Sequence, residues 1–330
     1  MKKRILIIQT ASLGDVILST ALAESLHAEL PGVEIHYLVK KGYQSLFKNH
    51  PFIYNVLYWD KSKHKYPGLF RLIREVRRNN YDTVINVQRF ASSGLIATLS
   101  GAKMRSGFRK NPFSMFYTHK YEHIISKEGV LHEVERNQTL ISPMVFTLAV
   151  RPALYPSVED FSRVSAFVNG PYITVSPASL WFTKQYPEEK WIDFLNNTPA
   201  NLVVILLGAE ADNDMCERIK NQAMNNVVNL AGQLSFLESA ALMKGAIMNY
   251  VNDSAPQHLA SAVNAPVAAI FCSTVPTFGF GPLSDNAHII EITAPLYCRP
   301  CGLHGFRQCP EGHFKCALDI QTNQLTQLLK

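Results

Sequence analysis

The chain has 330 residues, of which 47% are apolar and 10% aromatic, and its net charge is +6. This apolar content is enough for two hydrophobic cores of ordinary size, which excludes a disordered chain. No run of eighteen apolar residues occurs, and Gln9, Gly14 and Asp15 interrupt the start of the chain where a signal peptide needs an apolar stretch. We therefore expect a cytoplasmic protein without a transmembrane helix.

The positive charge is concentrated in the first half of the chain. Residues 1–150 contain 21 Lys and Arg against 11 Asp and Glu, whereas residues 151–330 contain 11 against 15. A basic face attracts anionic partners, and the candidates are a nucleic acid, a membrane surface or a phosphorylated acceptor. Solubility alone is the other interpretation. The basic residues form no known nucleic-acid-binding motif, so we expect no nucleic acid partner.

Strands and helices alternate over the first 150 residues. Apolar runs predict strands at 4–9, 33–39, 56–58 and 81–87 and within 101–108. Helical patterns occur at 15–26, 42–50, 67–79, 90–99 and 132–149. This order is typical of a Rossmann-like domain with a doubly wound parallel sheet. The first loop contains only one glycine, Gly14, so the dinucleotide fingerprint is missing and a nicotinamide oxidoreductase is a weak alternative.

A second alternation follows a less regular passage, made of residues 151–156 and 162–170, where we place the domain boundary. It predicts strands at 172–175, 202–207, 227–230, 247–251 and 267–271, and helices at 187–196, 212–221, 236–244 and 323–330. A further helix is expected after Ser254, its predicted N-cap, ending near Asn264. The predicted fold class is α/β, with two Rossmann-like domains, 1–155 and 156–330, facing a central cleft.

The loop Asn252-Asp253-Ser254-Ala255-Pro256 lies between two predicted strands joined by that helix. A helical crossover makes the two strands parallel neighbours. Ligands of open α/β sheets bind at the carboxyl ends of the strands, where free N–H groups of a helix N-terminus favour negative charge. The loop is therefore expected to face an anionic ligand, and a phosphate is the ligand that we predict.

Five segments carry a resemblance to a known family: SLGDVILSTALAESL near the start, LHEVERN at 131–137, KQYPEEKW at 184–191, LLGAEAD at 206–212 and NDSAPQHLA at 252–260. Together they resemble, in order, the motifs of glycosyltransferase family nine, the ADP-heptose:lipopolysaccharide heptosyltransferases. The resemblance implies a GT-B fold and metal-independent, inverting transfer of heptose from ADP-heptose to the inner core of lipopolysaccharide, without a cofactor. It also implies a lipid-linked oligosaccharide acceptor and peripheral contact with the inner face of the cytoplasmic membrane.

The resemblance implies roles for individual residues. Asp15 is expected to be the general base, because the acceptor hydroxyl must lose its proton as the new bond forms; capping of its helix is the structural alternative. Lys184 is expected to neutralise the diphosphate leaving group, with an ordinary surface lysine as the alternative. The full set implied for donor binding is Ser179, Lys184, Glu210, Asp253, Ser254, Ala255 and His258.

Some positions depart from the family pattern or have a second interpretation. Ala255 stands where glycine is more usual, so a methyl group could narrow the approach of the phosphate. His258 could equally be a structural helix residue. The residues implied for acceptor binding are Gly14, Arg105, Arg109 and Lys110. For the basic members of this set, a solvated loop is the alternative.

Four cysteines near the end of the chain, Cys298, Cys301, Cys309 and Cys316, have two histidines between them. They supply enough soft ligands for a structural zinc ion. A reduced, packed loop is the alternative, and since the family is expected to act without metal, this is the interpretation that we favour.

Two other functions remain open at this point. The chain could be a GT-B glycosyltransferase that uses another nucleotide sugar for cell-surface glycan synthesis. It could also be a non-catalytic two-domain ligand-binding protein, although Asp15 in the first loop and the basic N-terminal half argue against that.

Overall fold

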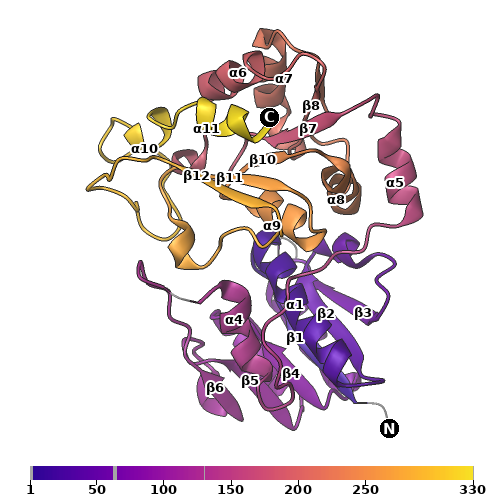
Figure 1. The fold of residues 1–330 in the computed structure, drawn as a ribbon. Coiled ribbons are helices and arrows are strands. Elements are labelled where there is room, and N and C mark those ends of the chain that lie inside the picture. Colours follow the sequence, from indigo (N-terminus) through magenta and orange to yellow (C-terminus); the bar gives the residue numbers. More distant parts are fainter. Residues whose placement is uncertain (1–2, 62–64, 130, 330) are drawn as a thin grey trace. The chain divides into compact units, whose positions relative to one another are not determined.

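The computed structural model describes residues 3–61, 65–129 and 131–329. The chain forms two compact units (Figure 1), one made of Met1–Ile125 with Leu131–Tyr155 and the other of Ser126–Val130 with Pro156–Lys330. Each unit contains a six-stranded sheet in which all paired strands are parallel. Within the described ranges, no helix combines the length and apolar character that crossing a bilayer requires.

The first sheet has the strand order β3-β2-β1-β4-β5-β6. Its strands are β1 (Arg4–Ile8), β2 (Glu34–Lys40), β3 (Ile53–Trp59), β4 (Thr83–Asn86), β5 (Met104–Phe108) and β6 (His119–Tyr121). The helices of this unit are α1 (Leu13–Glu29), α2 (Lys65–Arg78), α3 (Ala91–Leu99) and α4 (Glu133–Gln138). The chain leaves β1 in one direction along the sheet and β4 in the other, so the loops after these two strands flank the topological switch point.

The second sheet has the strand order β12-β11-β10-β7-β8-β9. Its strands are β7 (Tyr172–Ser176), β8 (Val203–Leu206), β9 (Val227–Asn229), β10 (Asn249–Asn252), β11 (Val267–Phe271) and β12 (Ala287–Glu291). The helices are α5 (Val158–Ser165), α6 (Glu188–Asn196), α7 (Asn213–Gln222), α8 (Phe236–Gly245), α9 (Ala255–Ala262), α10 (Lys315–Leu318) and α11 (Asn323–Thr326). The switch point lies between β7 and β10, and the predicted parallel pair joined by a helix is confirmed as β10, α9 and β11.

Most predicted elements are confirmed, but three predictions are wrong. The helix expected at 132–149 ends much earlier: α4 is followed by a single 3-10 turn, Thr139–Ile141, and Pro143 has no N–H to continue the helix. Residues 42–50 form only the 3-10 turn Tyr43–Phe47. The helix α5 extends into residues 162–165 of a stretch that was expected to be irregular, and a capping box of Ser157 and Asp160 starts it. The strands β6 and β12 and the short helix α10 were not predicted.

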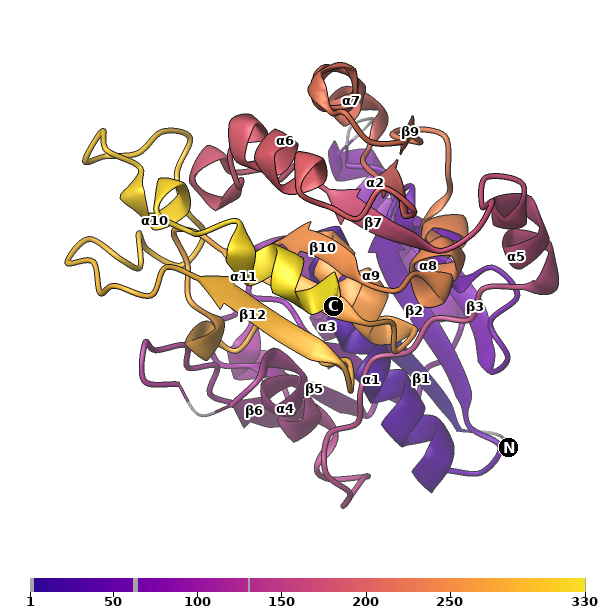
Figure 2. The same cartoon turned by 45° about the horizontal axis from the view of Figure 1, so that its top comes forward.

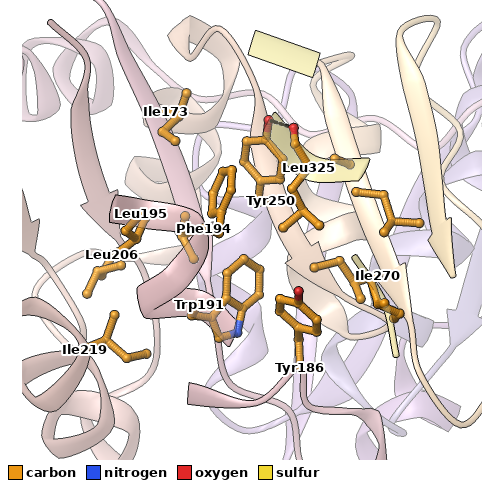
Figure 3. Packing of buried hydrophobic residues seen from close by; sticks show 14 of the residues in the cluster. Ile173, Tyr186, Trp191, Phe194, Leu195, Leu206, Ile219, Tyr250, Ile270 and Leu325 are labelled. Carbon is orange, nitrogen blue, oxygen red and sulfur yellow. Dashed lines mark hydrogen bonds between the residues drawn. The ribbon is translucent and has the colours of Figure 1, made fainter. Parts of the chain in front are cut away.

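Aromatic rings fill the core on one face of the second sheet (Figure 3). Trp191 and Phe194 of α6 are fully buried, and the ring of Trp191 meets that of Tyr186 edge-on at 5.1 Å. The ring of Phe194 lies 4.5 Å from that of Tyr250 on β10, and the Tyr250 hydroxyl donates to the Leu325 carbonyl at 2.9 Å. This bond attaches α11, which lies across the second sheet (Figure 2), to the centre of the sheet.

Candidate functional site

Lys184 and Asp253 form a buried ion pair at the switch point of the second sheet. Lys184 ends a 3-10 turn in the segment after β7, and Asp253 directly follows β10. The Lys184 Nζ lies 2.6 Å from Asp253 Oδ2, and the two side chains are only 15% and 8% exposed. The structure thus brings together two residues that the sequence predicted separately.

The Asp253 carboxylate is also held by two neutral donors that sequence analysis missed. Gln257 Nε2 of α9 donates to Oδ1 at 3.0 Å, and the Thr274 hydroxyl donates to Oδ2 at 2.6 Å. With a cation and two neutral donors, both carboxylate oxygens are fixed in direction. Thr274 follows β11, the neighbour of β10, so the rule that functional groups gather at strand ends could have found it.

The loop after Cys301 fixes the backbone next to Lys184. The buried Thr183 hydroxyl accepts from the Phe306 N–H at 2.8 Å, and the Thr183 N–H donates to the Phe306 carbonyl at 3.1 Å. Gly305 has φ +76°, and a Cβ there would lie 2.9 Å from Thr183 Oγ1 and 3.1 Å from Lys184 Cγ. Glycine fits this backbone conformation and this close approach without strain, whereas a residue with a Cβ would not.

Asp15 lies at the switch point of the first sheet, in the first turn of α1. It forms a capping box with Ser12: the Asp15 N–H donates to the Ser12 hydroxyl at 3.3 Å, and the Ser12 hydroxyl and N–H donate to Asp15 Oδ2 at 2.6 and 3.2 Å. Burial raises the pKa of Tyr43, and the Asp15 carboxylate contributes to that rise. The capping role considered for Asp15 is therefore real, and it occupies one of its two carboxylate oxygens.

A polar cluster that the sequence did not reveal lies beside this loop. The Thr10 hydroxyl and the Gln88 amide, which follow β1 and β4, are 2.9 Å apart. Lys61 Nζ donates to the Thr10 carbonyl at 3.0 Å and lies 4.9 Å from the centre of the Trp59 ring. The same edge of the sheet thus presents a cation near the loop that carries Asp15.

Comparison with known proteins identifies the family of the chain. Residues 69–309 match the model of glycosyltransferase family 9 (heptosyltransferase). The chain belongs to glycosyltransferase family 9. This confirms the resemblance seen in the sequence.

Two relatives show how far the similarity extends. Lipopolysaccharide heptosyltransferase 3 of Escherichia coli K12 is 27% identical over 308 residues, which cover 86% of this chain and 86% of that protein. Lipopolysaccharide heptosyltransferase 1 of Pseudomonas aeruginosa is 24% identical over 318 residues, with 90% and 86% covered.

Solved structures confirm the predicted GT-B fold. The E. coli ADP-heptose lipopolysaccharide heptosyltransferase II has a TM-score of 0.80 at 21% identity, with 100% of this chain and 97% of that chain covered. The E. coli heptosyltransferase WaaC with ADP has a TM-score of 0.72 at 20% identity, with 99% and 98% covered. The two parallel sheets of this family 9 chain are therefore those of a GT-B heptosyltransferase.

The other residues expected to bind the donor lie along the carboxyl edge of the second sheet. Ser254 is the N-cap residue of α9, as predicted, but its side chain makes no capping bond; its hydroxyl instead donates to the Asn252 carbonyl at 3.3 Å. Ala255 begins α9 and is not among the residues with positive φ, so alanine brings no backbone strain there. His258 is buried one turn later.

Two further residues of this set follow β7 and β8. Ser179 is half-buried, and its carbonyl accepts from Gln185 Nε2 at 2.6 Å. Glu210 is exposed in the 3-10 turn after β8, where Gly232, with φ +76°, packs against its backbone. Neither side chain belongs to the hydrogen-bonded group around Asp253.

The structure does not gather the four residues expected to bind the acceptor into one place. Gly14 is buried in the first turn of α1, whereas Arg109 and Lys110 are exposed just after β5, with Arg109 Nε 3.1 Å from Glu122 Oε1. Arg105 lies near the amino end of β5, and its Nε donates to the Phe116 carbonyl at 3.0 Å. Arg105 is therefore far along the strand from the switch-point edge.

The four C-terminal cysteines are all free thiols. Burial raises the pKa of Cys316 to about 12, and the nearby thiols of Cys301 and Cys309 add to the rise. In the described part of the chain, no three possible ligands lie close enough together to hold a metal ion. The zinc hypothesis gains no support from these residues; Cys316 is buried whereas Cys298, Cys301 and Cys309 are half-buried, and the reduced, packed loop stays a prediction.

One shallow cavity lies beyond β11 and β12. It has a volume of about 280 Å³ and is lined by Val275, Ile292, Thr293, Ala294, Pro295, Leu296 and Arg299. The Arg299 guanidinium already bonds to Glu291 at 2.6 Å and to the Cys272 carbonyl at 2.8 Å. The ion pair of Lys184 and Asp253 is not part of this cavity.

Substitution of Gly305 tests whether its loop supports Lys184. We expect Gly305→Ala to lower the free energy of unfolding by about 2 to 4 kcal/mol, because the methyl group adds contact with Thr183 and Lys184 to the cost of a left-handed alanine. Urea unfolding of Gly305→Ala and of a control variant, Gly312→Ala, measures this loss of stability.

Gly312 provides a matched control, because it has a similar φ of +70° but no atom within 4 Å of its Cβ position. Gly312→Ala should cost only the conformational part, about 1 to 2 kcal/mol. Equal losses in the two variants would show that the close approach of Gly305 carries no energy.

Proposed function

We propose that this family 9 protein is an inverting, metal-independent heptosyltransferase that transfers heptose from ADP-heptose to a lipid-linked inner-core acceptor of lipopolysaccharide. The observation that carries the proposal is the buried pair of Lys184 and Asp253 at the switch point of the second sheet. The names of the relatives support the choice of sugar, and the WaaC structures with ADP and with ADP-2-deoxy-2-fluoro heptose support the choice of nucleotide.

The proposed donor site lies in the second unit. As the glycosidic bond of the donor breaks, negative charge develops on the diphosphate, and the Lys184 ammonium stabilises it. The N–H groups in the first turn of α9, which Ser254 leaves without a side-chain cap, add partial positive charge. Ser179, Glu210 and His258 complete the donor site in this proposal.

Asp253 is proposed to bind hydroxyl groups of the sugar. Because Asp253 is paired with Lys184, one site offers a cation to the anionic diphosphate of the donor and a carboxylate to the hydroxyl groups of its neutral sugar. When Lys184 turns to the diphosphate, Asp253 keeps the hydrogen bonds from Gln257 and Thr274 and so retains its orientation. Thr274 and Gln257 are therefore positioning residues in this scheme.

The first unit is proposed to bind the acceptor, with Asp15 as the general base. Inversion in a single displacement needs one base and no protein nucleophile. Ser12 holds Asp15 through Oδ2, and the Asp15 carboxylate is the group that we assign to the acceptor hydroxyl. Gly14, Arg109 and Lys110 remain candidate acceptor contacts, and Arg105, at the far end of β5, is the weakest of this group. The site of action is proposed to be the inner face of the cytoplasmic membrane.

Calorimetric binding of nucleotides tests the class of donor. We expect ADP to bind more tightly than AMP, UDP or GDP, with the same affinity in the presence of EDTA and of magnesium. AMP lacks the second phosphate, which the cation of Lys184 would contact. A preference for UDP or GDP would keep the glycosyltransferase assignment but change the sugar donor, and an absence of binding to all four would favour a different ligand class.

Lys184→Ala should weaken ADP binding by about 1.5 to 3 kcal/mol, because it removes a charge-assisted contact and leaves the Asp253 carboxylate without its cation. Lys220→Ala is the control: this lysine of α7 is 41% exposed and 3.8 Å from Glu217. A folded Lys184→Ala protein with unchanged ADP affinity would assign Lys184 to the ion pair alone. Melting curves of both variants establish that they are folded.

Asp15→Asn should lower the transfer rate by about 10²-fold or more while ADP affinity stays constant, since asparagine cannot take the proton of the acceptor hydroxyl. Ser12→Ala separates this role from capping: it removes the cap, at a cost of about 1 kcal/mol in stability, but keeps the carboxylate. If both variants lose transfer to the same extent, Asp15 acts by positioning α1 and not as a base.

A further inference from the structure

The outer face of α2 carries a row of basic side chains around one large apolar side chain. Phe70, Arg71, Arg74, Arg77 and Arg78 are all exposed, and Phe70 is 60% exposed. We call these five residues the arginine face. The opposite side of α2 is anchored, because it buries Leu69, Leu72, Ile73 and Val76 in the core of the first unit. The arginine face therefore cannot turn inward.

The four arginines of this face have no ion-pair partner among the residues that the structure describes. By contrast, Arg4, Arg136, Arg218 and Arg299 each contact a carboxylate at 2.6 to 2.8 Å. The only acidic residue of α2 is Glu75. The positive charge of the face is therefore not neutralised by the part of the protein that the structure describes.

Exposed apolar side chains also lie on the side of the first sheet that α2 covers. The α2 and α3 helices and Tyr117 share one hydrophobic cluster, so they cover the same face of the first sheet. Next to Tyr117, the 3-10 turn Ser114–Phe116 exposes Met115 by 72% and Phe116 by 51%. The loop after α3 passes Arg77, with the Cβ position of Gly101 3.9 Å from Arg77 Cγ, and it also exposes Lys103.

We propose that this surface of the first unit, made of the arginine face with Lys103, Met115 and Phe116, docks on a membrane that contains anionic phospholipids. Guanidinium groups match phosphate oxygens in bidentate geometry. Basic residues near an anionic leaflet each add to binding. Apolar side chains such as Phe70 and Met115 then enter the boundary between headgroups and acyl chains.

A lipid surface fits this face better than a nucleic acid does. Base stacking needs aromatic rings set along a groove that follows a strand, whereas Met115 cannot stack and Phe70 projects from the outside of a helix. The inference rests on the proposed function only in one respect: a lipid-linked acceptor explains why the first unit, and not the second, would approach the membrane.

Vesicle binding of the full chain tests the proposal. We expect binding to vesicles of phosphatidylcholine with phosphatidylglycerol and little binding to phosphatidylcholine alone. Arg71→Gln/Arg74→Gln should weaken binding to the anionic vesicles about 10-fold or more, because two charges next to the headgroups are lost. Phe70→Ser should weaken it several-fold, and this loss should persist in high salt, which screens only the charges.

A matched control removes the same charge from the second unit. Arg163→Gln/Lys244→Gln replaces two exposed basic residues there and should leave vesicle binding unchanged. If this control weakens binding as much as the α2 variant, net charge alone is responsible and the docking surface is refuted. Equal binding to both vesicle types would refute it too, as would tighter binding to a single-stranded oligonucleotide than to anionic vesicles at the same ionic strength.

The same variants separate this proposal from the proposed function. Arg71→Gln/Arg74→Gln should keep the affinity for ADP and the transfer to a water-soluble, delipidated acceptor, while transfer to acceptor embedded in vesicles falls. Vesicle binding without any transferase activity would leave the docking surface in place and contradict the enzyme assignment. Transferase activity without vesicle binding would support the enzyme assignment and refute the docking surface.

Discussion

The buried carboxylate of Asp253 sets the organisation of the second unit. A carboxylate only 8% exposed is costly unless it is paired and hydrogen-bonded, and breaking a buried pair by removing one partner typically costs several kcal/mol. Its three donors come from three separate segments: Lys184 after β7, Gln257 on α9 and Thr274 after β11. The ends of three adjacent strands are thereby held in one arrangement, and the loop containing Gly305 fixes the segment that carries Lys184. Misplacing any of these segments would leave a charge without its partner.

The two units share a topology but use their switch points differently. In the second unit, the acid is buried and its charge is balanced by a lysine from another loop. In the first unit, Asp15 is half-buried and is held by Ser12, a residue of its own helix start, so its second oxygen is not part of the capping box. A buried, balanced acid suits the orientation of a ligand, whereas a half-buried carboxylate held only by neutral donors of its own capping box suits exchange of a proton. This contrast is consistent with donor binding in one unit and acceptor activation in the other.

The sequence predicted the fold well because both sheets are parallel and buried, and such strands appear as continuous apolar runs. Residues 267–271 were predicted as a strand with the bounds that β11 has. The edge strands β6 and β12 were missed because they are short or half-exposed, and α5 was missed although Ser157 and Asp160 carry a capping signal. Asp15, Lys184 and Asp253 could be selected by motif. Thr274, Gln257 and Gly305 could not, since their importance depends on contacts between segments distant in the sequence.

The short segment that begins at Ser126 has a consequence for how the protein can be divided. It lies between two parts of the first unit in the sequence but belongs to the second unit, where the Cβ position of Gly129 is 2.7 Å from the Thr277 carbonyl. The chain therefore passes between the units three times, after Ile125, before Leu131 and after Tyr155. A chimera joined only at residue 155 would bring a foreign piece into the unit that it was meant to preserve. An exchange of the second unit between relatives therefore has to move residues 126–130 together with residues 156–330.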